Sequence, residues 1–513
     1  MTPTISVPLN RFASFLDVLS HPPPPGTPGP SLPVLNPTES FWLTPEDNPL
    51  LKEGSTGALG SDEVDICIIG SGISGISALW YLLKGLHEIK ETKGKEKVKV
   101  MVLEARDFCS GATGRNGGHL LPNPFLGFSH VQSVHGTSEA IKAFDFETRC
   151  TNNILDFIQS SGIASEIDLV EGGHMMLLFT QEEEKSVKVD YDEALKAGMK
   201  LENIEWVEEP VVERRYGAPY PGLKIRGYNL WPSKLVTALF NASKKLADES
   251  NNSIELYLHT STPVTSITSD GTDSSHQHTL HTPRGLIKAN YILHATNAYA
   301  SYLLPSLYGP NGIIPTRGQV IAIRHNLGRG TEKDGEMKKL SWDGNEGFEY
   351  WFPRPRPHIP NSESLRMRTS TQTPPGTPPP FPLIILGGAR EMAKGYEAYV
   401  SDDSERNPEV GEGLRKFLGS VFVGSGVGVV EKEWTGIMGY TRTGDPFVGP
   451  VLNPGSEKIR VPRQYVAAGY TGHGMPRAVA CGEIVASMIL SDMEGKTWDK
   501  PHWIPETYLT WNK

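Results

Sequence analysis

A glycine-rich turn between a strand and a helix constrains this chain more than any other feature of its sequence. The turn is Gly70-x-Gly72-x-x-Gly75; it follows the apolar run 64–69 and opens residues 74–86, which have the apolar spacing of a helix. The first glycine makes the turn tight, the second lets backbone approach a pyrophosphate, and the third lets the helix pack closely on the strand. The helix N-terminus then offers N–H groups to the phosphates. We therefore expect a dinucleotide site here.

An acidic residue after the next apolar run completes this expected site. Residues 98–103 are typical of a second buried strand, and Glu104 follows them. Its carboxylate can accept hydrogen bonds from ribose hydroxyls, and it disfavours NADP. Glu104 lies 104 − 75 = 29 residues after Gly75, whereas the usual spacing is about twenty. We attribute the excess to a polar loop over residues 87–97. The alternative is an ordinary strand–helix–strand unit that binds no nucleotide.

A second glycine-rich segment favours FAD over NAD. Residues 110–119 contain four glycines, with hydroxyl side chains and Arg115 between them. Such a loop can bring many N–H donors against a second nucleotide portion, which a plain NAD domain does not need. The alternative is a flexible surface loop.

Composition excludes several classes of protein. The 513 residues carry a net charge of −10, and a chain with this balance is a poor candidate for binding nucleic acid. The four cysteines have no CxxC spacing, so they favour a reducing compartment over a metal or disulfide framework. We see neither a signal peptide nor an unbroken apolar span. We therefore expect a cytoplasmic protein that binds no membrane, and we leave its oligomeric state open.

Two proline-rich stretches interrupt the alternating helices and strands. Residues 21–38 predict an extended arm that Phe41 and Trp42 anchor on the body, and residues 369–382 predict a surface insertion between two strands. We expect no chemistry from either stretch. The order of the remaining elements favours a doubly wound sheet with a second, strand-rich lobe.

Several strings in this sequence resemble the FAD-dependent amine and amino-acid oxidase family of the DAO type. The resemblance spans about residues 62–495, and the string at 114–118 is typical of the gamma-glutamylputrescine oxidase-like branch. The strings that carry it lie at residues 68–75, 103–106, 110–119, 294–298, 315–319, 433–450 and 465–475.

The resemblance implies an α/β fold in which a Rossmann-type FAD-binding domain is interleaved with an antiparallel-sheet substrate domain. The expected FAD-binding domain comprises residues 62–120, 225–311 and 431–495. The expected substrate domain comprises residues 121–224 and 312–430. Residues 1–61 then form a proline-rich N-terminal extension, and residues 496–513 form a C-terminal tail.

The resemblance also implies which residues hold FAD. At the pyrophosphate we expect Gly70, Ser71, Gly72, Ile73, Ser74, Gly75, Thr296 and Asn297. At the adenosine we expect Glu104, Ala105, Arg106 and Val264. Beside the flavin we expect Ser110, Gly111, Ala112, Thr113, Arg115, Asn116, Gly117, Gly118, Gly472, His473, Gly474 and Met475. N–H donors of the last group would stabilise negative charge on the reduced ring.

The reaction implied by the resemblance is oxidation of an amine. Hydride passes from the carbon next to nitrogen to flavin N5, the imine hydrolyses, and O2 or another acceptor takes the electrons. We expect His473, Arg477 and Tyr350 at the catalytic site. Alternatives are a tailoring dehydrogenase with a non-amine substrate and a non-catalytic FAD-binding protein. Tyr350 also has the alternative of ordinary core packing, together with Trp342.

Two departures from the family's pattern bear on the cofactor and the substrate. Met438 stands where sarcosine-oxidase relatives have a cysteine bonded to the flavin, so non-covalent FAD is expected. Pro476 stands where those relatives have a substrate-binding lysine. The substrate then either lacks an α-carboxylate or uses Arg477, for which a surface position is the alternative.

Overall fold

The computed structural model shows two mixed sheets that share one long cavity. It describes residues 4–60, 62–93, 97–250, 253–269, 278–327, 339–355, 381–422, 424–455 and 459–513. The expected α/β fold, with one mostly parallel sheet and a second sheet, is confirmed.

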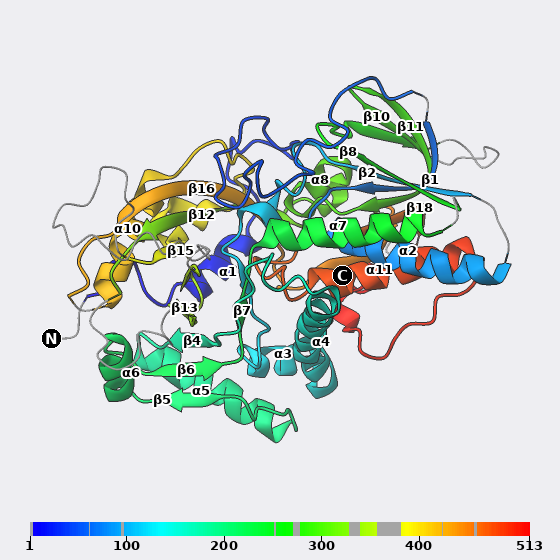
Figure 1. Cartoon of the computed structure of the whole chain (residues 1–513). Helices are drawn as coiled ribbons and strands as arrows, with labels where there is room; N and C mark the ends of the chain where they lie inside the picture. The colour runs from blue at the N-terminus through cyan, green and yellow to red at the C-terminus, as the bar shows by residue number, and fades with distance from the viewer. Residues whose placement is uncertain are drawn as a thin grey trace.

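The first sheet has the strand order β17-β18-β11-β1-β2-β8, and a β9–β10 hairpin extends from β11 (Figure 1). The run from β18 to β8 is parallel, whereas β17 and β10 pair antiparallel. The strands are β1 (Asp62–Ile69), β2 (Val98–Leu103), β8 (Ile254–His259), β9 (Ser266–Ser269), β10 (His278–Thr282), β11 (Gly285–His294), β17 (Phe447–Leu452) and β18 (Arg460–Ala468). Because β1, β2 and β11 are parallel, their carboxyl ends meet at one edge of the sheet.

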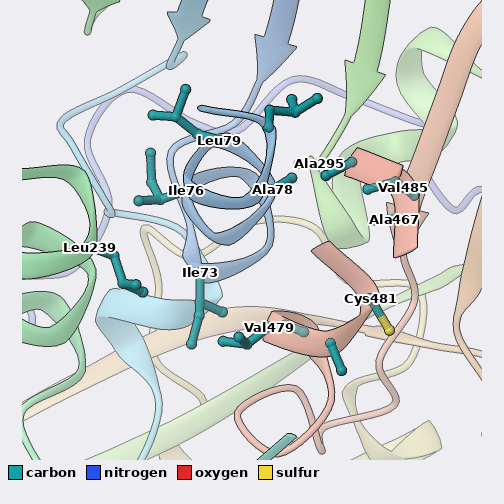
Figure 2. Packing of buried hydrophobic residues seen from close by; sticks show 14 of the residues in the cluster. Ile73, Ile76, Ala78, Leu79, Leu239, Ala295, Ala467, Val479, Cys481 and Val485 are labelled. Carbon is teal, nitrogen blue, oxygen red and sulfur yellow. The ribbon is translucent and has the colours of Figure 1, made fainter. Parts of the chain in front are cut away.

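Three helices cover one face of this sheet: α2 (Ile73–Lys93), α7 (Pro232–Asp248) and α11 (Ala478–Met493). Their buried apolar side chains form one cluster, in which Leu79, Leu239 and Val485 lie (Figure 2). The helix α2 continues to Lys93, so the polar loop that we expected over residues 87–97 is wrong for most of its length. The long spacing to Glu104 comes from extra helical turns instead.

The second sheet has the order β16-β12-β15-β14-β13-β4-β6-β5. Its neighbours are antiparallel except for the parallel pair β13 and β4. The strands are β4 (His174–Leu177), β5 (Glu205–Val207), β6 (Gly222–Ile225), β12 (Ile314–Arg324), β13 (Ser341–Gly344), β14 (Glu349–Pro353), β15 (Leu383–Gly387) and β16 (Val429–Tyr440). The strand β16 therefore belongs to the second sheet, although our expected boundary at residue 431 assigned most of it to the FAD-binding domain. The expected insertion at 369–382 falls between β14 and β15, and its residues 369–380 lie outside the described part of the chain.

The other α-helices of the described residues lie outside this group of three (Figure 1). They are α1 (Phe12–Ser20), α3 (Phe128–His135), α4 (Thr137–Ser161), α5 (Gln181–Lys196), α6 (Glu209–Tyr216), α8 (Ala300–Leu303) and α10 (Pro408–Val421). A two-stranded ladder joins β3 (His119–Leu120) to β7 (Tyr228–Asn229). Within the described residues, no helix combines the length and the apolar composition that a bilayer crossing needs.

The N-terminal arm is fixed to the body at Trp42, as expected. The indole of Trp42 is fully buried, and its Nε1 donates to Asn116 O at 2.6 Å. Trp231 Nε1 and Ser233 Oγ donate to Trp42 O at 3.0 Å and 2.6 Å. The arm is therefore part of the packed structure.

Candidate active site

A cavity of about 970 Å³ runs from the carboxyl ends of β1, β2 and β11 to the strands β12, β14 and β16 of the second sheet. Among the residues expected at the cofactor, those that line it are Gly70, Gly72, Ile73, Ser74, Glu104, Ala105, Arg106, Gly111, Ala112, Thr113, Arg115, Asn116, Gly117, Val264, Thr296, Asn297, Gly472, His473, Gly474 and Met475. Ser71, Gly75, Ser110 and Gly118 are not among the lining residues. The structure thus brings motifs from both ends of the chain to one place.

The glycine turn has the shape that a bound pyrophosphate requires. Gly70 has φ +111°, and a Cβ on Gly75 would overlap Gly70 O. A Cβ on Gly72 would contact only Thr113 Oγ1 at 3.2 Å and would otherwise face the cavity. Thr113 Oγ1 also accepts a hydrogen bond from Ile73 N at 3.1 Å, which holds the second glycine loop over the start of α2. The first turn of α2 contains no acidic residue, so its N-terminus favours an anion.

Glu104 lies at the end of β2, where its carboxylate is held in place. Its Oε2 accepts from Ser71 N at 3.0 Å and from Ser71 Oγ at 2.7 Å, and its Oε1 accepts from Arg106 N at 3.0 Å. A carboxylate has about four acceptor positions. Three of them are used here, so Glu104 keeps capacity for a ribose hydroxyl.

The two arginines of the glycine loops bind the protein itself. Arg106 Nη1 donates to both oxygens of Asp403 at 2.8 Å and 3.0 Å. Arg115 donates from Nη1 to Thr38 O at 2.7 Å and to Thr435 O at 2.9 Å. Burial lowers the pKa of Arg115 to about 10, although Asp403 acts in the opposite direction. Both guanidinium groups thus fasten the loops within the protein, and both residues also line the cavity, so their expected contact with the cofactor stays a prediction.

One buried hydroxyl in the cradle is left for a ligand. Thr296, which follows β11, lines the cavity, and its buried Oγ1 has no hydrogen-bond partner among the described residues. Its neighbour Asn297 accepts from Gly469 N at 3.0 Å and so fastens the loop that follows β18. An unpartnered buried hydroxyl is costly unless a ligand bonds to it. The glycine turn, Glu104 and Thr296 together fit a dinucleotide.

The loop that contains His473 is fastened by a buried carboxylate. The side chain of Glu147, in α4, is 2% exposed; its Oε2 lies 2.9 Å from His473 Nε2, and its Oε1 accepts from Arg477 Nε at 2.7 Å. Burial alone would raise the pKa of Glu147, but the charges of His473 and Arg477 lower it to about 2. Arg477 Nη1 donates to Gly444 O at 2.7 Å. Arg477 is therefore no surface residue, and two of its donors are already bonded within the protein.

Tyr350 faces the cavity from β14, as expected, whereas its aromatic neighbours do not. The ring of Tyr350 packs against Gly117 so closely that a Cβ there would overlap it. Burial raises the pKa of the Tyr350 hydroxyl to about 12, so it is neutral at ordinary pH. Trp342 on β13 and Phe352 on β14 are fully buried in the core. The alternation of faces along β14 cannot separate Tyr350 from Phe352, because residues two apart in a strand share a face of the sheet.

Sequence reasoning missed Arg390, which lies just after β15. Its Nη1 is buried without a hydrogen-bond partner, and its side chain lines the cavity. The guanidinium carbon lies 4.9 Å from the ring centre of Phe15, 5.3 Å from that of Phe348 and 5.1 Å from that of Tyr440. The available signal was the string Gly387-Gly-Ala-Arg390 directly after a buried strand, where residues at a sheet edge often meet a ligand.

The family model for FAD-dependent oxidoreductases named DAO matches residues 65–488. This chain belongs to the DAO family. Its cofactor is FAD, because the family is FAD-dependent. The cradle described above is where the chain's residues would hold that cofactor.

Known proteins that resemble this DAO-family chain cover most of its length. A probable oxidoreductase OrdL from Rhizobium meliloti (strain 1021) is 23% identical over 441 residues, which is 84% of each chain. The glycine oxidase from Geobacillus kaustophilus superposes with a TM-score of 0.55 and 19% identity, covering 85% of this chain and 97% of its own. For an L-amino acid deaminase from Proteus vulgaris the TM-score is 0.59 and the identity 13%, with 93% and 100% coverage. These structures show a shared fold.

Proposed function

We propose that this oxidoreductase oxidises the carbon–nitrogen bond of an amino acid or a related amine that carries a carboxylate. When bound, FAD accepts the two electrons of such an oxidation as a hydride from the carbon next to nitrogen. The observation that carries the proposal is Arg390, a residue that lines the cavity and whose buried Nη1 has no hydrogen-bond partner among the described residues. The structures of glycine oxidase and L-amino acid deaminase, which share the fold, support the same substrate class.

Arg390 suits a carboxylate better than Arg477 does. A guanidinium presents parallel N–H donors that match the two oxygens of a carboxylate. Arg477 already donates to Glu147 and to a backbone carbonyl, whereas Arg390 has an unpartnered Nη1. The nearby Glu349 competes weakly, because burial and the adjacent Glu391 raise its pKa well above the ordinary value. The raised pKa favours the neutral form of Glu349, which competes less for the positive charge of Arg390 than a carboxylate would.

The cavity around Arg390 favours the neutral amine, which is the form that can give up a hydride. Removal from water disfavours the charged ammonium form, so burial in this cavity lowers the amine's pKa. Burial lowers the pKa of His119, which lies beside Tyr350, to about 3, so this imidazole adds no charge. The hydroxyl of Tyr350 stays protonated and can hydrogen-bond to the substrate. We assign substrate positioning to Tyr350 and carboxylate binding to Arg390.

His473 serves the cofactor end of the cavity in this proposal. Glu147 fixes its Nε2, so the imidazole cannot rotate away from the loop at residues 472–475. A histidine held by a buried carboxylate can place positive charge near the electron-rich edge of a reduced cofactor. Glu147 acts through His473 and is therefore a positioning residue.

We also propose that FAD is bound without a covalent link. Met438 lines the cavity on β16, and none of the four cysteines does. All four are buried free thiols, which also supports our prediction of a reducing compartment such as the cytoplasm. Denaturing the protein should release all its flavin into the supernatant, and flavin that stays with the precipitated chain would contradict this.

Anaerobic mixing of the purified yellow protein with a panel of amino acids, amines and nitrogen-free alcohols tests the proposal. We expect one or more of them to bleach the visible flavin absorbance, and oxygen then to restore it with release of peroxide. The product should be the carbonyl compound, with ammonia or the shortened amine.

Bleaching only by substrates without nitrogen would favour the tailoring-dehydrogenase alternative. A flavin that no substrate reduces would favour a non-catalytic FAD-binding protein. The gamma-glutamylputrescine oxidase-like branch stays a prediction that the same panel tests.

A further inference from the structure

The N-terminal extension, residues 1–61, contributes side chains to the cavity from α1 and from the proline-rich arm, although the family model does not cover it. That model begins at residue 65, whereas Phe12, Phe15 and Leu16 of α1 line the cavity. Leu32 and Pro33, in the arm, line it as well. We expected no chemistry from the proline-rich arm. The arm nevertheless forms part of the cavity wall.

Helix α1 packs against the second sheet (Figure 1). The guanidinium carbon of Arg390 lies 4.9 Å from the ring centre of Phe15 in this helix. Phe15 is 1% exposed, and its ring lies edge-on to that of Tyr440 at 5.0 Å. The backbone of α1 is held at both ends, since Phe12 N donates to Glu346 Oε2 at 3.0 Å and Tyr399 Oη donates to His21 O at 2.6 Å. These contacts fix the position of the helix relative to the guanidinium.

Phe12, Phe15 and Leu16 share one face of α1, because residues three and four apart in a helix are neighbours. On this face Phe12 is 46% exposed and Leu16 is 37% exposed, although both are large and apolar. Both line the same cavity as Arg390. Covering these two side chains with an apolar group would remove their surface from water, which is favourable.

We propose that Phe12, Phe15 and Leu16 form the subsite for an apolar side chain of the substrate, with Arg390 at its inner end. The inference rests on the proposed carboxylate role of Arg390. It makes α1, in the N-terminal extension, the segment that selects amino acids with a large apolar or aromatic side chain over small ones. Selectivity of this kind is set by differences in buried apolar area between substrates.

Two carboxylates without an amine test this subsite independently of oxidation. Phenylpropionate is phenylalanine without its amine, and acetate is glycine without its amine. Titrating each into the FAD-loaded full chain and following the flavin spectrum gives a Kd. We expect wild type to bind phenylpropionate more tightly than acetate. Phe12→Ala and Leu16→Ala should each weaken phenylpropionate about tenfold and leave acetate unchanged.

Leu35→Ala is the matched control, because Leu35 lies in the same N-terminal extension, is 84% exposed and is not among the cavity-lining residues. Phe12 and Leu16 are chosen over Phe15 because partly exposed side chains can be truncated without opening the core. Equal effects on both carboxylates, no effect in either variant, or no phenylpropionate binding by wild type would overturn the inference. Selective loss of phenylpropionate in a protein that oxidises no amine would leave the subsite standing and reject the proposed function.

Discussion

The two ends of the cavity are built in different ways. At the cofactor end, short contiguous strings supply backbone donors and small residues, and the arginines there are bonded to Asp403 and to carbonyl groups. At the substrate end, side chains from distant segments converge, and the unpartnered buried donor there is the charged Arg390 Nη1, whereas at the cofactor end it is the neutral hydroxyl of Thr296. A buried donor without a partner costs free energy that a ligand can recover. The difference indicates where the variable ligand binds.

A substitution in the glycine turn should have the largest effect, and it should be confined to the cofactor end. In Gly75→Val the new Cβ would overlap Gly70 O, so α2 must move away from β1. We expect FAD affinity to fall by at least about 3 kcal/mol, or ~100-fold, and the protein to purify colourless. Flavin absorbance per protein and a Kd from flavin fluorescence measure this. Gly29→Ala is the control, because a Cβ there meets nothing within 4 Å. Full flavin content in Gly75→Val would show that the close packing is not needed.

The second prediction concerns Glu147, which links α4 to the loop of His473. Its pKa is lowered from 4.5 to about 2 in the folded chain, so ionisation stabilises the fold above pH 4.5, and this contribution is lost as the pH falls toward 2. Glu147→Gln should lower the free energy of unfolding by about 3 kcal/mol at neutral pH and by progressively less in acid. Urea unfolding of the FAD-loaded wild type and variant, at neutral pH and in acid, measures the difference in free energy of unfolding. Glu202→Gln, at an exposed carboxylate, should change little. A deficit that does not depend on pH would contradict the charge argument.

The third and smallest effect is expected at Tyr350, which lies where the two ends meet. Tyr350→Phe keeps the ring against Gly117 and removes only the hydroxyl. We expect kcat/KM for the amine substrate to fall about fivefold, the loss of one ordinary hydrogen bond. FAD content should not change. Tyr257→Phe serves as the control, since Tyr257 is 37% exposed and does not line the cavity. An unchanged kcat/KM would remove Tyr350 from the substrate site.

The same difference between the two ends explains how far the sequence could predict them. The glycine turn, Glu104 and the loop at residues 110–119 are local strings, each of which carries its own geometry, so their convergence on one cavity could be predicted from the sequence. The contacts of single side chains in that loop could not be predicted. Arg115 has the same neighbours in sequence whether it contacts a cofactor or Thr38, and only the folded arm decides between them.

The substrate end depends on contacts across the whole chain. Arg390 contacts Phe15 from α1 and Tyr440 from β16, and the spacing of these residues in the sequence does not predict the contacts. The arm's proline content correctly indicated an extended segment, but it could not show which surface the segment covers. The predicted end of α2 was wrong as well, because charged residues continue a helix as readily as they form a loop.

Reduction of the bound flavin by a matched pair of substrates tests the central claim most directly. The pair is an amino acid that bleaches the flavin and the amine that remains when its carboxyl group is removed. The measured quantity is the anaerobic reduction rate as a function of concentration, in wild type, in Arg390→Ala and in Arg442→Ala, whose arginine is exposed. We predict that Arg390→Ala loses about 100-fold in efficiency toward the amino acid, or about 3 kcal/mol, and little toward the amine, while Arg442→Ala matches wild type. Equal losses toward both substrates, or no loss at all, would contradict the account.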